Sequence, residues 1–98
     1  METENAQQPA TLAEAINRVV EELSEDRRRE IRRLDADELA GLHLTLGAYI
    51  RNTFGLWGDN EALHMACVPD RPPWEIAADD ASAVIVRGVW EQLRGEDR

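Results

Sequence analysis

The sequence predicts an all-α fold: a compact single domain of four or five helices packed around a buried C-terminal helix. Apolar residues recur every three or four positions through residues 12–23 and 39–54, as on the inner side of amphipathic helices. Residues 81–93 are apolar on most sides, which is typical of an enclosed helix. A chain of 98 residues has room for one hydrophobic core.

The first predicted helix begins after Thr11. Residues 1–10 are polar and aperiodic, so we expect a flexible leader there, one helical domain over residues 11–95 and a frayed end at residues 96–98. Thr11 and Glu14 have capping-box spacing, in which each side chain accepts a hydrogen bond from a backbone N–H at the start of the helix. The apolar stripe of this helix is Leu12, Ile16, Val19, Val20 and Leu23.

A second, short helix is predicted from Ser24 to about Leu34, with Ser24 as its N-cap. Residues 24–38 hold five arginines and six acidic residues, a net charge of −1. We interpret the arginines as a solvated face with ion pairs at helical spacing. The alternatives are docking onto an acidic partner and the binding of one phosphate or carboxylate. The arginines are Arg27, Arg28, Arg29, Arg32 and Arg33.

The third and longest of these helices is predicted from the Asp35-x-x-Glu38 cap to about Phe54. Gly41 and Gly47 lie inside it, and each costs up to about 1 kcal/mol relative to alanine, which close approach of another helix would offset. Gly55 is well placed to end the helix. The predicted apolar stripe is Leu39, Leu42, Leu46, Tyr49, Ile50 and either Thr53 or Phe54.

Two more helices are predicted in the C-terminal third of the chain. A short one follows Asn60 and ends near Cys67. Prolines then make residues 68–74 an extended, stiff loop, because proline lacks an N–H and restricts the residue before it. Asp79 is predicted to cap the last helix, which runs to about Arg94.

A polar constellation connects the third and last helices. His43 falls on the apolar stripe, where an imidazole needs hydrogen-bond partners. We expect Arg51 to pair with Asp79 or Asp80 in a buried or half-buried bidentate link that fixes the register of the two helices. The alternative is a cleft in which Arg51 binds an anionic ligand and His43 acts as an acid or base. The candidate polar cluster is His43, Arg51, Asn52, Asp79, Asp80 and Ser82.

Three blocks of the chain resemble an uncharacterised family of small bacterial helical domains. The blocks are a leading Thr-Leu-x-Glu-Ala helix, an L-H-x-x-L-G-x-x-I-R-N-x-x-G-L-W block over residues 42–57, and a D-D-A-S helix that begins at residues 79–82. This sequence departs from the family pattern at Ala77 and Ala78, where the family tends to have His-Pro. The resemblance implies the helical architecture and brings no activity with it.

Composition excludes several classes of function. A net charge of −9 argues against binding to nucleic acid or to an anionic membrane. All 11 basic residues are arginine, so a lysine nucleophile, a Schiff base and a P-loop are excluded. The single cysteine, Cys67, forms no internal disulfide, and with His64 it offers two metal ligands where zinc needs about four. We therefore expect no metal and no cofactor, and a cytoplasmic protein.

The leading hypothesis is a non-enzymatic protein-interaction or regulatory module, of the small acidic adaptor, immunity or antitoxin type. Its acidic surface would steer a partner protein, and Trp57 and Trp74 are candidate anchors on loops. The alternative is a domain that binds a small anionic nucleotide or metabolite through His43, Arg51 and Asn52. No catalytic residue is assigned, and the sequence leaves the oligomeric state open.

Overall fold

The computed structural model describes residues 8–56, 60–72 and 75–96, and within these ranges the chain is all-α, as predicted. The residues between the helices form turns and short loops, and one 3-10 helix, η2 (Ala36–Glu38), precedes α3. No helix in the described ranges is both long and apolar enough to cross a lipid bilayer. The α-helices are α1 (Leu12–Glu22), α2 (Glu25–Arg32), α3 (Leu39–Thr53), α4 (Glu61–Cys67) and α5 (Ala78–Glu96).

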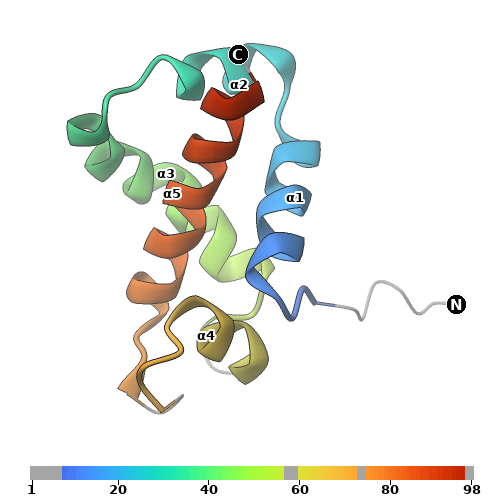
Figure 1. Ribbon diagram of the computed structural model, residues 1–98, viewed down its shortest axis with the longest axis vertical. Coiled ribbons are helices and arrows are strands. Elements are labelled where there is room, and N and C mark those ends of the chain that lie inside the picture. Colours follow the sequence, from blue (N-terminus) through green and yellow to red (C-terminus); the bar gives the residue numbers. More distant parts are fainter. Residues whose placement is uncertain (1–7, 57–59, 73–74, 97–98) are drawn as a thin grey trace, which may run out of the picture.

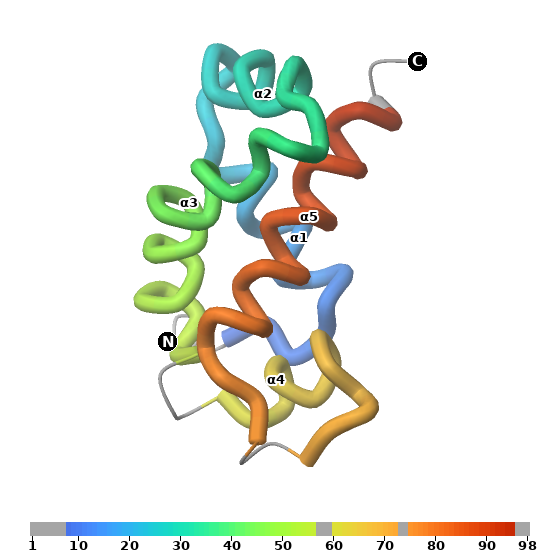
Figure 2. The backbone as a smooth tube through the Cα atoms, turned by 90° about the vertical axis from the view of Figure 1, so that its left-hand side faces the viewer, coloured from blue at the N-terminus to red at the C-terminus, as the bar shows by residue number. Residues whose placement is uncertain are grey.

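The C-terminal helix α5 is the centre of the molecule, and α1, α2, α3 and α4 all pack against it. In Figures 1 and 2, α1 runs beside α5 in the same direction, α3 runs in the opposite direction, and α2 and α4 lie near its two ends. Its inner residues include Ile85, Val86, Val89 and Leu93, which are fully buried. Burial of this helix by all its neighbours explains why its sequence is apolar on most sides.

The helix starts follow the sequence closely at α1 and α2. Thr11 Oγ1 accepts a hydrogen bond from the Glu14 N–H, and Ser24 Oγ accepts one from the Arg27 N–H. The Glu14 carboxylate completes the cap differently from the prediction, because it accepts from the N–H of Ala10.

The start of α5 differs from the prediction. Ala78, which was expected to precede the helix, is its first residue. The carbonyl of Ala77 accepts hydrogen bonds from the N–H groups of Asp80 and Ala81. Asp79 is therefore not the N-cap but lies in the first turn, where its negative charge complements the helix dipole.

The turn between α3 and α4 is built from Gly55 and Asn60. Gly55 adopts a left-handed conformation with φ of 70°, and the Leu56 N–H donates to the Arg51 carbonyl, which ends α3 in a Schellman motif. The buried Asn60 Nδ2 donates to the carbonyls of Phe54 (2.9 Å) and Pro9 (3.0 Å). Pro9 is itself buried, so this part of the expected leader contacts the helical body.

The far end of the molecule is tied together by side chains on helix and turn carbonyls. The Trp90 indole donates to the Leu34 carbonyl (2.8 Å), and the Arg94 guanidinium donates to the same oxygen and lies over the Trp90 ring. Arg32 Nε donates to the carbonyl of Leu93 (3.1 Å). These contacts attach α2 and the turn after it to the last turns of α5.

Candidate functional site

Arg51 and Asp79 form the ion pair that the sequence predicts, with Arg51 Nη1 and Asp79 Oδ1 3.2 Å apart. The same Nη1 donates to Ser82 Oγ (3.0 Å), and that hydroxyl donates to the Asp79 carbonyl (3.2 Å). The Arg51 side chain is 15% exposed and that of Asp79 is 81% exposed. The guanidinium therefore joins α3 to the first turn of α5 from a sheltered position, and its acidic partner is in solvent.

Gly47 makes the room that the Arg51 side chain occupies. A Cβ at this position would lie 3.1 Å from Arg51 Nη1 and 3.7 Å from Ser82 Oγ. The glycine in the middle of α3 is thus explained by the polar link to α5. This agrees with the prediction that Gly47 leaves space beside the guanidinium.

The structure gives the other members of the predicted polar cluster different surroundings. Asp80 faces Arg71 of the proline loop (3.4 Å), and Asn52 is exposed on α3. His43 is half-buried and lines a hollow of about 400 Å³ between α3 and α5, together with Asp37 and Arg87. Arg51, Asp79 and Ser82 therefore lie together, and the His43 imidazole lies apart from them in its own hollow.

The remaining candidates from the sequence have structural roles or cannot be placed. Trp57 and Trp74 lie outside the described residues. His64 is buried, and its Nε2 lies 2.9 Å from the Leu56 carbonyl. Cys67 is buried and free, and this burial raises the pKa of its thiol to about 11. No group of three or more histidine, cysteine or acidic side chains in the described part of the chain could hold a metal ion.

The arginine run of α2 forms ion pairs on its own helix. Arg27 pairs with Glu30 (2.7 Å) and Arg29 with Asp26 (3.4 Å). Arg28 combines an ion pair to Glu25 with a hydrogen bond from its Nε to the Val20 carbonyl (3.0 Å) at the end of α1. These contacts agree with the interpretation of a charged, solvated face, and Arg28 also caps a neighbouring helix.

The outer side of α3 carries a feature that the sequence reasoning missed. Its exposed residues, Ala40, Gly41, Leu44, Thr45, Tyr49, Asn52 and Thr53, include no charged side chain. In the whole chain 32% of residues are charged, and α1, α2, α4 and α5 all expose charged residues. Leu44 is 79% exposed, and Tyr49, expected on the inner stripe, is 40% exposed. The signal in the sequence was the absence of charge between Leu39 and Ile50 on every side of the helix.

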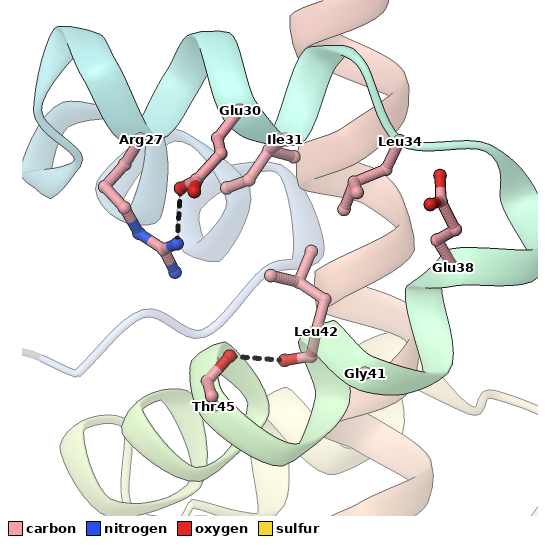
Figure 3. Close-up of a pocket in the computed structure, with 8 residues that line it drawn as sticks. All are labelled: Arg27, Glu30, Ile31, Leu34, Glu38, Gly41, Leu42 and Thr45. Atoms are coloured by element: carbon pink, nitrogen blue, oxygen red, sulfur yellow. Dashed lines mark hydrogen bonds and ion pairs between the residues drawn. The ribbon is translucent and has the colours of Figure 1, made fainter.

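A groove separates this side of α3 from α1 and α2. It consists of two adjoining hollows of about 340 and 310 Å³, and both are lined by Arg27 and Thr45. Figure 3 shows the first hollow, with Arg27 and Glu30 projecting from α2 into the space above α3. We call the two hollows together the lateral groove. Its apolar lining is Val19, Leu23, Ile31, Leu34, Leu42 and Leu46.

Gly41, on the wall of this groove, has no role in internal packing. A Cβ at this position would have no atom within 4 Å. By contrast, a Cβ at Gly88 would overlap the Ile16 side chain where α1 meets α5. Glycine lowers helix stability by up to about 1 kcal/mol relative to alanine, and at position 41, in the first turn of α3, no atom of the described residues lies within 4 Å of the place a Cβ would take.

Comparison with known proteins places the chain in a family without assigning an activity. No curated protein and no solved structure matches it. The profile of one family, described as a domain of unknown function (DUF6794), matches residues 8–93. This match runs from Gln8, next to the buried Pro9, to Leu93 in the last turns of α5 and so includes nearly all of the helical body. The protein therefore belongs to this family of domains of unknown function.

Proposed function

We propose that this domain is a non-enzymatic protein-interaction module that binds a partner protein over the outer side of α3. The observation that carries the proposal is the uncharged, partly apolar surface of that helix on a strongly acidic chain. We define the α3 ridge as Gly41, Leu44, Thr45, Ala48 and Tyr49. Exposed apolar surface of this kind marks protein contacts more often than isolated exposed residues do.

The shape on both sides of the ridge supports the proposal. The lateral groove lies on one side of α3, and the hollow that His43 and Arg87 line lies on the other. A partner that straddles the ridge would bury Leu44 and fill both depressions. Interfaces gain most of their affinity from a few well-packed side chains, tyrosine prominent among them, so Tyr49 is suited to that role and Leu44 adds apolar surface beside it.

The geometry gives less support to the alternative, a small anionic ligand held by His43, Arg51 and Asn52. Arg51 Nη1 is already bonded to Asp79 and Ser82, so an anion at that nitrogen would compete with both of them. Arg51 is not among the described residues that line the lateral groove or the hollow beside His43. The role of Arg51 that its contacts support is to hold α3 against α5.

The proposal includes a cytoplasmic location and a bacterial family. A reducing compartment suits a buried free thiol such as that of Cys67. The role we assign to the Leu42–Ile50 part of α3 is to form the ridge and its inner face. Gly47, Arg51 and Ser82 then set the position of that helix on α5.

Site-specific photo-crosslinking in the cells that make the protein tests this function. A photoreactive amino acid at position 44 or 48 is expected to give a discrete crosslinked product with a second protein. Matched positions are Ala13 on α1 and Ala62 on α4, both exposed and away from the ridge. Equal crosslinking from all four positions, or crosslinking from positions 13 and 62 alone, would contradict a binding surface on α3.

A further inference from the structure

The lateral groove has the dimensions of a short helix. The wall formed by the end of η2 and by α3 runs from Glu38 to Tyr49, which at about 1.5 Å per residue is about 17 Å. A helix of about 12 residues has this length and satisfies its own backbone hydrogen bonds. An extended segment would need a sheet edge to pair with, and the described chain offers helices only.

The floor of the groove is apolar and lies between two helical walls. Ile31 is 1% exposed and Leu42 is 7% exposed, and they face each other with Leu34 beside them in Figure 3. Leu23 and Leu46 continue this surface into the second hollow. Apolar side chains that recur every three or four residues on a docked helix would be buried along this floor.

The rim of the groove is acidic. Glu22, Glu30 and Glu38 line it and are exposed, and Arg27 is the one basic residue among the lining side chains. The Arg27 guanidinium is bonded to Glu30 at 2.7 Å, which neutralises one acidic group. Two copies of this chain, each with a net charge of −9 and an acidic rim, would repel each other. Charge complementarity therefore favours a basic occupant.

We propose that the lateral groove binds a basic amphipathic helix of the partner protein, with apolar side chains on the floor and arginine or lysine at the rim. This inference rests on the proposed function and identifies the chemistry of its partner. The incoming basic residues pair with Glu22 and Glu38 and displace Arg27 from Glu30. In the free domain the Arg27 guanidinium therefore takes the place at Glu30 that a basic residue of the ligand takes in the complex.

The first test measures binding of a designed peptide by fluorescence anisotropy. The probe is a capped helical peptide of about 14 residues, with leucine on one side and arginine elsewhere. Two controls are a permuted peptide of the same composition and the same peptide with glutamate in place of arginine. The arginine peptide is expected to bind about tenfold more tightly than the permuted one and to weaken as salt is added. Equal affinity for the arginine and permuted peptides would overturn the inference, because it would indicate attraction by net charge alone.

Matched variants locate the binding site. Thr45 lines both hollows, so Thr45→Arg is expected to weaken binding by about tenfold, and Thr53→Arg, on the same helix but outside the groove, by less than about twofold. Glu22→Arg is expected to weaken binding more than Glu21→Arg, which makes the same charge change on the neighbouring residue. Circular dichroism of each variant checks that the fold is retained. Equal effects within either pair would contradict binding in the groove.

The displacement of Arg27 predicts a gain of affinity. Arg27→Gln removes the competing cation and frees Glu30, so binding is expected to strengthen severalfold. Arg29→Gln removes the same charge outside the groove and is expected to change affinity little. Weaker binding with Arg27→Gln would overturn the displacement mechanism.

The outcomes separate this inference from the proposed function. Crosslinking from positions 44 and 48 to a protein, together with no preference for the arginine peptide, would support the interaction module and overturn the basic helix. Self-association of the chain in sedimentation experiments, abolished by Thr45→Arg, would make a second copy the occupant and would also overturn it. Groove-specific binding of the arginine peptide supports it.

Discussion

Arg51 and Asp79 connect α3 to α5 through an ion pair whose two ends differ in exposure. The Arg51 side chain is sheltered, and the Asp79 carboxylate is 81% exposed at 3.2 Å from it. Exposed charge contributes little to stability, because water and salt screen it. Ser82, which is 1% exposed, accepts a hydrogen bond from the same guanidinium nitrogen. The position of α3 therefore depends more on the buried stem of Arg51 and on Ser82 than on the charge of Asp79.

Substitutions at these positions are expected to destabilise the domain in a fixed order. Arg51→Ala loses packing and hydrogen bonds and is expected to cost about 2 kcal/mol. Ser82→Ala is expected to cost about 1 kcal/mol, and Asp79→Asn less than about 1 kcal/mol. Urea unfolding measures each free energy, with Asp80→Asn as the control on a neighbouring exposed carboxylate. A loss from Asp79→Asn as large as that from Arg51→Ala would show that the ion pair itself holds the helices.

Asn60 is expected to be more important for stability than its exposed counterpart Asn17. Its Nδ2 donates to two carbonyls and its Oδ1 accepts from the Leu63 N–H, all in a buried setting. Asn60→Ala leaves these groups without partners and is expected to lower the unfolding free energy by about 2–3 kcal/mol. Asn17→Ala is expected to cost less than about 1 kcal/mol. Thermal and urea unfolding check both values, and a change of similar size for the two variants would contradict the role of Asn60.

Gly41 and Gly88 are expected to respond in opposite directions to alanine. Gly41→Ala meets no atom and gains helix propensity, so it should stabilise the domain by up to about 1 kcal/mol. Gly88→Ala forces the Ile16 side chain to move and should destabilise it by about 1 kcal/mol or more. Both are measured by urea unfolding. If Gly41→Ala destabilised the domain, the glycine would be required for packing within the domain. The account in which it only borders the surface for a partner would then be contradicted.

The unfolding free energy is expected to fall at alkaline pH because of Cys67. Burial raises the pKa of its thiol from 9.0 to about 11, so the folded chain holds the proton more tightly than the unfolded chain. This contribution is fully present below pH 9.0 and is lost as pH rises toward about 11. The chain has no lysine, and Tyr49→Phe removes its single tyrosine, so little else titrates there.

The control for this prediction is Cys67→Ala. In the Tyr49→Phe background, unfolding in urea is measured between pH 8 and pH 11, with the thiol present or replaced by alanine. The alkaline decline should be smaller with alanine at position 67. The same decline in both proteins would show that Cys67 does not cause it.

Local signals in the sequence were sufficient for most of the fold. Thr11, Ser24 and Gly55 mark helix ends through interactions with backbone only a few residues away, so spacing alone predicts them. The Arg51–Asp79 link was predictable because its residues stand at adjoining ends of two helices. The cap at Asp79 was wrong because backbone geometry at Ala77 and Ala78, which periodicity does not reveal, begins α5 two residues earlier.

Tertiary arrangement decided the parts that the sequence could not predict. Tyr49 fits the apolar stripe of α3, but that helix packs chiefly on α5, and a groove remains on the side toward α1 and α2. The binding of Asn60 to Pro9 joins residues far apart in the chain, which no local pattern indicates. The lateral groove likewise depends on the spacing between helices and not on the repeat of apolar residues along each helix.

The most direct test of a binding role for α3 is the native mass of the tagged domain purified from the cells that make it, with Leu44→Gln compared against Met65→Gln. Leu44 and Met65 are both exposed apolar side chains, 79% and 49% exposed, and only Leu44 lies on the α3 ridge. The unchanged protein and Met65→Gln are expected to carry a second protein, and Leu44→Gln is expected to be recovered as the free chain, of 11.1 kDa plus the mass of the tag, with its stability unchanged. Recovery of the unchanged protein only as the free chain, or a complex that survives Leu44→Gln intact, would contradict the account.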